Sequence, residues 1–351
     1  MDPRMVLAFS LIFVFVVGAC VGSFLNVCIA RLPLEKSLLW PSSRCGDCLQ
    51  PIHWYDNLPL ISYLWLRGRC RTCGQSYSVL YLVVELGVAL GFVGLFWLEV
   101  VDNVHGWPGP RPGAFSFGAA TSWLGFGWHA LLLSFLVIAS VCDMQSREIP
   151  LQLTLTGTLI GLVGSALLPW FFPHASGIAP NGNINQGIYP WPFWLPLPEW
   201  CGGGDTWQTG LATGVIGALV GTFLLRVIGF IFSAGLGKEA LGLGDADLMM
   251  MAGSFLGWQI VVVAFFLSVI PALFFGIIQL VVRKDNSLPF GPSLSVSVMA
   301  TCLAWHPIGI HLREILFSGD ILIAAIVLCV VLLFVMSFML RQMRKKEEPE
   351  P

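Results

Sequence analysis

The chain has 351 residues, of which 56% are hydrophobic and 11% are charged. A typical soluble domain carries about 25% charged residues, so the composition excludes an ordinary soluble enzyme, a disordered chain and a coiled coil. The net charge of −2 provides no field that would attract a polyanion, and nucleic acid is not expected as a partner. The composition indicates an all-α polytopic membrane protein whose surface contacts membrane lipid.

A membrane-spanning helix requires about 20 mostly apolar residues, and the sequence predicts about eight or nine such helices. The shorter stretch Leu248–Trp258 is a further span, a re-entrant segment or the first half of a broken helix. The longer apolar runs lie near Val6–Ile29, Val79–Val100, Ala120–Val141, Leu151–Phe172, Leu211–Phe232, Ile260–Val282, Ser293–Ile310 and Ile321–Leu340.

The distribution of Lys and Arg orients the predicted spans, because these residues favour cytoplasmic loops. Nine crossings with the N-terminus outside and the C-terminus in the cytoplasm bring most of them to one side. The apolar run continues past Val17–Cys20, a loose match to a lipoprotein cleavage site, so we expect a retained first span. Trp170–Gln208 contains no Lys or Arg and is expected to be a long external loop.

Four cysteines form two Cys-x-x-Cys pairs after the first span, Cys45 with Cys48 and Cys70 with Cys73. Their spacing approximates a zinc ribbon or treble clef, in which each pair presents two thiolates to one tetrahedral Zn²⁺ ion. Because four sulfur ligands leave no open position, the predicted zinc is structural. Redox-active dithiols and unliganded thiols are the alternatives, whereas structural disulfides are disfavoured in the reducing cytoplasm.

Two aspartates lie at the predicted cytoplasmic boundary. Asp143 ends the third span, and Asp245 follows Gly242 and Gly244 just before the short apolar stretch. Two adjacent carboxylates share a proton, so one activates water while the other protonates the carbonyl oxygen. The glycines allow the backbone to approach a substrate strand closely. The pattern predicts an aspartic protease with Asp143 and Asp245 as catalytic residues, and with Gly242, Gly244 and Asp247 in an active-site loop.

Simpler roles for these residues stay open at this point. Asp143 and Arg147 have the i, i+4 spacing of an interfacial ion pair. Asp245 is a good residue type for a helix N-cap. Asp247 is alternatively the catalytic acid, a partner of the helix dipole or a modulator of the two catalytic carboxylates.

Four sequence blocks, in order, carry a more specific pattern. They are Gly22–Pro33; the cysteine pairs with Asn57–Leu64 and Tyr81–Glu85; Asp143 with Ile149-Pro150; and Glu239–Asp245 with Gly253–Trp258 and Pro289–Pro292. Over roughly residues 18–295, their order and spacing resemble the type IV prepilin leader peptidases.

This resemblance implies a bacterial inner-membrane aspartic peptidase, with Asp143 and Asp245 catalytic. Such enzymes remove the basic leader of type IV prepilins or type II secretion pseudopilins at the cytoplasmic membrane face. Many members then methylate the new N-terminus from S-adenosylmethionine. The implied organisation is a first helix at 1–30, a cytoplasmic zinc-binding domain at 31–78, a second helix and external loop at 79–119, a peptidase core at 120–295 with an external loop at 172–206, and C-terminal helices and tail at 296–351.

The chain departs from the family pattern at Asp247, where a lysine is usual. An anion there is expected to disfavour ionisation of Asp245 if the two side chains face each other. The Gly-x-Gly-Asp sequence also marks the presenilin and signal-peptide-peptidase group, but its Tyr-Asp pair matches only Tyr55-Asp56, in the polar cysteine loop.

Two other function classes compete with the peptidase. A transporter would bind a proton or cation on membrane aspartates, but such sites favour the midplane and inverted repeats. A zinc-ribbon membrane scaffold without chemistry would leave Asp143 and Asp245 replaceable.

Overall fold

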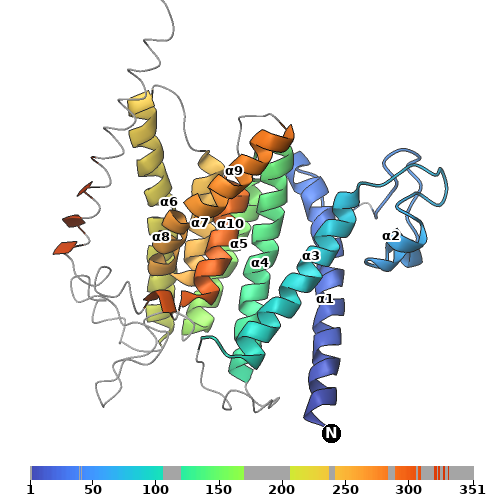
Figure 1. Ribbon diagram of the computed structural model, residues 1–351, viewed down its shortest axis with the longest axis horizontal. Helices are drawn as coiled ribbons and strands as arrows, with labels where there is room; N and C mark the ends of the chain where they lie inside the picture. The colour runs from blue at the N-terminus through green and yellow to red at the C-terminus, as the bar shows by residue number, and fades with distance from the viewer. Residues whose placement is uncertain are drawn as a thin grey trace, which may run out of the picture. The chain divides into compact units, whose positions relative to one another are not determined.

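The computed structural model describes residues 2–38, 40, 42–105, 120–169, 206–236, 242–283, 289–305 and 307–309, with scattered positions between 320 and 331. Over this part of the chain the regular structure is helical, apart from two isolated β-bridges (Figure 1). Five of the described helices are long and apolar enough to cross a membrane. The predicted all-α membrane class is therefore confirmed.

The chain divides into two compact units, Met1–Leu153 and Thr154–Pro351. The predicted domain boundaries are finer than this division and stay predictions.

The first unit contains the membrane helices α1 (Pro3–Arg31), α3 (Val79–Phe96) and α4 (Ala120–Ser146). Figure 1 shows α1 (blue) crossing α3 (cyan), and the two helices are in extensive contact. Small residues let the backbones approach: a Cβ atom on Gly22 would lie 2.7 Å from the Cα atom of Glu85. Such close crossings are typical of membrane helices.

The cysteine loop lies between α1 and α3 and contains only short elements. These are η1 (Leu32–Leu34), η2 (Trp54–Asn57) and α2 (Ile61–Trp65). Antiparallel bridges join Arg44 to Pro51 and Arg69 to Ser76, one in each Cys-x-x-Cys turn. With so little regular structure, the loop depends on specific polar contacts for its shape.

Two polar contacts hold this framework: one joins α1 to α3, and the other joins the loop to α3. The Asn26 side-chain amide on α1 donates to the Tyr81 carbonyl oxygen at 3.0 Å. The Leu60 backbone N–H donates to the Glu85 carboxylate on α3 at 2.8 Å. Both Asn26 and Glu85 are buried, so the bonds fix the start of α3 and the loop on one framework.

The second unit contains the helices α6 to α10, together with nearly all of α5, which begins just before the boundary between the units. The helix α7 is almost entirely buried, and Leu248, Met249, Met251 and Ala252 are 0% exposed. It contacts α6 backbone to backbone, because a Cβ on either Gly217 or Gly253 would meet the carbonyl group of the other. The elements are α5 (Leu151–Leu167), α6 (Trp207–Leu236), α7 (Leu243–Leu256), α8 (Trp258–Leu267), α9 (Val269–Arg283) and α10 (Gly291–Leu303).

Several predicted spans differ from the observed helices. The runs expected at 151–172 and 293–310 correspond to the shorter apolar helices α5 and α10. The stretch expected at 248–258 lies mostly in α7, which ends at Leu256 because Gly257, with a φ of 81°, breaks the helix before α8 begins at Trp258. The external loop predicted at 172–206 lies almost wholly outside the described residues, as does most of the span predicted at 321–340.

Candidate active site and metal centre

Asp143 lies in the last turn of α4 and is 8% exposed. The helix ends there because Arg147 adopts a left-handed φ of 61° and Pro150 follows. The Arg147 backbone N–H donates to the Asp143 carbonyl oxygen at 3.0 Å. The terminus therefore holds a buried carboxylate in the first unit, and the side-chain ion pair of Asp143 with Arg147 stays a prediction.

Asp245 lies in the first turn of α7 and is 9% exposed. Gly242 occupies the N-cap position, so the alternative in which Asp245 itself caps the helix is wrong. The positive end of the helix dipole favours a negative charge in this turn. Gly244 and Asp247, which were expected in a loop, are helical residues of α7. The second unit therefore places a buried carboxylate at a helix N-terminus.

Asp247 forms an ion pair with Arg226 of α6, in which Nη2 lies 3.2 Å from Oδ1. The Asp247 side chain is 15% exposed, and that of Arg226 is 56% exposed. Arg226 lies inside the apolar run predicted at Leu211–Phe232, and the sequence alone does not indicate its partner. The contact gives Asp247 a cation within the second unit, where the family pattern has a lysine.

The four loop cysteines come together as the spacing predicts. Their sulfur atoms all lie within 4.8 Å of one another, and Sγ of Cys45 is 3.8 Å from Sγ of Cys73. In a tetrahedral zinc site with Zn–S bonds of about 2.3 Å, neighbouring sulfurs are roughly 3.8 Å apart. The geometry and the donor set fit Zn²⁺, so the cluster can hold a structural metal ion.

The two cysteine turns have matching backbones. In each, a backbone N–H of the first cysteine bonds a glutamine carbonyl: Cys45 to Gln50 at 3.0 Å and Cys70 to Gln75 at 2.8 Å. Backbone N–H groups, chiefly that of Cys73, lower the pKa of Cys70 to about 6. The backbone therefore favours the metal-binding thiolate form at Cys70, whereas desolvation and contacts with the other three cysteines raise the pKa of Cys73 to about 12.

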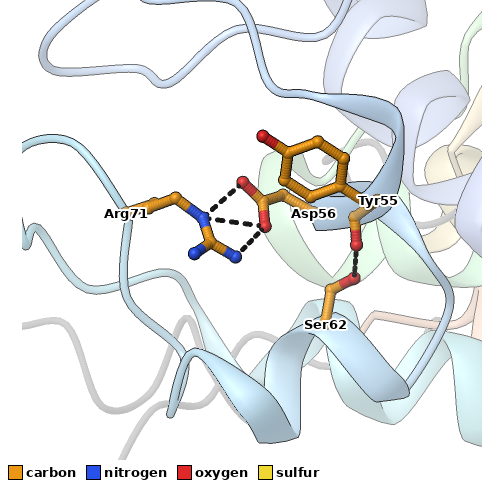
Figure 2. A network of polar contacts seen from close by, with 4 residues as sticks. All are labelled: Tyr55, Asp56, Ser62 and Arg71. Carbon is orange, nitrogen blue, oxygen red and sulfur yellow. Dashed lines mark hydrogen bonds and ion pairs between the residues drawn. The ribbon is translucent and has the colours of Figure 1, made fainter.

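A polar network braces the second turn (Figure 2). The Arg71 guanidinium donates two parallel hydrogen bonds to Asp56, with Nη2 2.6 Å from Oδ1 and Nε 2.9 Å from Oδ2. Arg71 also lies over the Tyr55 ring, and the Ser62 hydroxyl donates to the Tyr55 carbonyl oxygen. The hydrogen bonds from Arg71 lower the pKa of Asp56. Tyr55-Asp56 therefore has a structural contact in the loop.

Comparison with known proteins decides the family. Residues 16–98 match the model of the bacterial peptidase A24 N-terminal domain, and residues 203–277 match that of the type IV leader peptidase family. A prepilin leader peptidase/N-methyltransferase of Pectobacterium carotovorum is 32% identical over 80% of this chain and 88% of its own length. The chain belongs to the type IV leader peptidase family.

Other relatives carry the same name. That of Myxococcus xanthus is 32% identical over 71% of this chain and 56% of its own length. That of Pseudomonas putida is 29% identical over 80% of this chain and 86% of its own length. No solved structure matches the chain.

The family matches divide the candidate residues into three groups. The first match contains the four cysteines, and the second contains Asp245 with the Arg226–Asp247 pair. Asp143 lies between the two matched segments. The transporter class is not favoured for this leader peptidase family member.

Asn26 and Glu85 lie within the sequence blocks Gly22–Pro33 and Tyr81–Glu85, but the sequence alone gives neither residue a role. The signal was a polar residue in each of two apolar spans, 59 positions apart. Their hydrogen bonds to Tyr81 and Leu60 explain why membrane helices tolerate them.

Proposed function

We propose that this chain is a prepilin leader peptidase that removes the basic leader of type IV prepilins or type II secretion pseudopilins. The observation that carries the proposal is that Asp245 opens a buried helix inside the segment matched by the leader peptidase family model. The names of the relatives support the substrate class. Asp143, which is also buried at a helix end, is the proposed second catalytic carboxylate.

The mechanism assigns one role to each carboxylate. One of Asp143 and Asp245 accepts a proton from water, whose oxygen adds to the scissile carbonyl carbon. The other donates a proton to the carbonyl oxygen. When the tetrahedral intermediate collapses, the C–N bond breaks and the leaving amine takes a proton. Glycines at 242 and 244 leave room for the substrate strand at the start of α7.

The test is leader cleavage in membranes that contain a prepilin substrate. Asp143→Asn and Asp245→Asn should each reduce the rate by about 10²–10⁴-fold, the usual contribution of a general acid or base. Asp102→Asn is the matched control, since Asp102 is an exposed aspartate just after the π-helical turn that follows α3. This variant should cleave at the wild-type rate. Cleavage by either catalytic variant at the wild-type rate would exclude the aspartic mechanism.

We further propose that the chain lies in the bacterial inner membrane with its N-terminus outside and its C-terminus in the cytoplasm. The clustering of Lys and Arg supports this orientation. A cysteine-reactive, membrane-impermeant label should reach an engineered cysteine beside Asp2 from outside, and the loop at 42–78 only after the membrane is opened. Labelling of that loop in intact cells would reverse the orientation.

The cysteine cluster is the proposed site of a structural Zn²⁺ ion, held by Cys45, Cys48, Cys70 and Cys73. The ion would join the two turns of a loop that has little regular structure. Replacing Cys45 and Cys73 with serine should release the zinc and expose residues 42–78 to proteolysis. A loop that resists protease equally well without these cysteines would refute the structural role.

N-methylation of the new N-terminus, with S-adenosylmethionine as donor, is the second proposed activity, and the names of the relatives support it. In this reaction the amine nitrogen attacks the sulfonium methyl group and S-adenosylhomocysteine leaves. Incubation with a cleaved peptide and methyl-labelled donor should label the peptide N-terminus. An unlabelled peptide under conditions that support cleavage would restrict the chain to peptidase activity.

A further inference from the structure

Glu99, His105 and His129 form a buried polar cluster in the first unit. Their side chains are 0%, 12% and 5% exposed. The Glu99 Oε1 atom lies 2.6 Å from Nδ1 of His129 and 3.2 Å from Nε2 of His105. Two imidazoles thus point a nitrogen at one carboxylate oxygen.

The backbone is shaped to bring these residues together. Glu99 lies in a π-helical turn, Trp97–Val101, in which the Asp102 N–H bonds the Trp97 carbonyl at 2.9 Å. Turns of this π-helical kind are rare in proteins overall, and those that do occur are often found at functional sites. The chain then reverses through Asn103, at a left-handed φ of 47°. This reversal returns His105 to Glu99.

His129 reaches the same carboxylate from α4. Aromatic residues line this part of the unit, with the Phe96 ring 5.1 Å from that of Trp123 and 5.8 Å from that of Phe126. In apolar surroundings, a carboxylate that is 0% exposed requires a counter-charge.

One oxygen of Glu99 has no partner within the described part of the chain. Among these residues the buried Oε2 atom forms no hydrogen bond, although Oε1 accepts contacts from two histidines. Buried polar atoms are normally satisfied. A bound cation would be ligated by the two histidine nitrogens and by the Glu99 carboxylate. Because a carboxylate binds metal through one or both of its oxygens, the cation could also satisfy Oε2.

We propose that Glu99, His105 and His129 bind a divalent transition-metal ion of the zinc class. One carboxylate and two imidazoles form a common protein ligand set for Zn²⁺. At bond lengths of about 2.0–2.1 Å, tetrahedral ligand atoms are roughly 3.3 Å apart. The His105 separation of 3.2 Å matches this value. The His129 separation of 2.6 Å widens when the metal replaces the shared proton.

This site is separate from the cysteine cluster, which precedes α3, and from Asp143, the proposed catalytic carboxylate of the same unit. Asp143 lies 14 residues beyond His129 on α4, a distance of about 21 Å along a helix. The proposal depends neither on peptidase activity nor on metal at the cysteines.

Metal counting on the purified full-length protein tests the site, with Co²⁺ as the probe. Glu99→Gln and His129→Gln should each bind one ion per chain fewer than wild type. Ser134→Ala is the matched control, since this buried α4 hydroxyl donates to the Ala130 carbonyl oxygen of its own helix at 2.8 Å, and the variant should bind as many ions as wild type. Equal counts in all four proteins would overturn the site.

A second measurement requires no substitution and covers the case in which a variant fails to fold. X-ray absorption at the zinc edge of the wild-type protein, reconstituted with Zn²⁺ alone, should show nitrogen and oxygen ligands. Spectra fitted by sulfur ligands alone, or the absence of bound zinc, would overturn the proposal. A metal count that is one ion per chain lower in Glu99→Gln and His129→Gln than in wild type, together with nitrogen and oxygen ligands in the wild-type spectrum, would establish the site.

Discussion

Arg226 on α6 forms an ion pair with Asp247 on α7, with Nη2 and Oδ1 3.2 Å apart. The contact lies two residues beyond Asp245, so it joins the proposed catalytic helix to its neighbour. It also compensates the negative charge that replaces the usual lysine. Because the Arg226 side chain is 56% exposed, solvent screens the pair and its free energy is small.

Removing this pair should therefore have a modest effect. Asp247→Asn and Arg226→Gln should each lower the free energy of unfolding by at most about 1 kcal/mol. Leader cleavage should persist in both, in contrast to Asp245→Asn. Thermal unfolding in detergent and a cleavage time course are the measurements. If Asp247→Asn were as inactive as Asp245→Asn, Asp247 would be a catalytic group.

Replacing two glycines of the first unit with alanine should change the stability of the protein in different directions. A Cβ on Gly22 would lie 2.7 Å from the Glu85 Cα, whereas nothing lies within 4 Å of one on Gly87. Gly22→Ala should lower the free energy of unfolding by about 1–3 kcal/mol, because the added methyl group overpacks the contact between the helices. Gly87→Ala is the control and should be neutral or stabilise by up to roughly 1 kcal/mol. Equal Tm values for both variants would contradict the close crossing of α1 and α3.

The matching cysteine turns provide a reciprocal test. Leu49 and Gly74 both adopt left-handed conformations, with φ of 57° and 74°. A left-handed residue other than glycine costs roughly 1–2 kcal/mol. Gly74→Leu should therefore weaken zinc retention against a chelator, and Leu49→Gly should not. Loss of zinc at the same chelator concentration in both variants would show that backbone strain does not limit the site.

Glu85 should stabilise the loop through its acceptor oxygen. Glu85→Ala leaves the Leu60 N–H without its bond, at a cost of about 1–3 kcal/mol. Hydrogen exchange at the Leu60 amide should accelerate in Glu85→Ala and much less in Glu85→Gln, which retains an oxygen. Unchanged exchange in the alanine variant would mean that the Leu60 amide is protected by other means.

The sequence predicted those features that depend on local patterns. Apolar runs located the long membrane helices, and the repeated Cys-x-x-Cys spacing predicted a cluster in which Cys45 and Cys73 now lie 3.8 Å apart. Local pattern also indicated Asp245 as a candidate catalytic residue, whereas its position in the first turn of α7 became evident only from the backbone.

Contacts between residues far apart in the sequence could not be predicted from local patterns. Arg226 and Asp247 are 21 positions apart, and Glu99 and His129 are 30 apart. Their meeting depends on the rotation and depth of packed helices, which hydrophobicity alone does not determine. The π-helical turn at Trp97–Val101 rotates Glu99 away from the position that a regular helix would give it.

The glycine contact between α6 and α7 has a consequence for how the membrane acts on the proposed catalytic helix. No side chain separates Gly217 from Gly253, and buried α7 presents little surface to lipid, whereas Phe223 and Phe230 of α6 are 68% and 75% exposed. Changes in bilayer thickness act on lipid-facing residues. Because α6 is the main neighbour of α7, we expect a change in bilayer thickness to alter the membrane depth of the Asp245 carboxylate chiefly by moving α6.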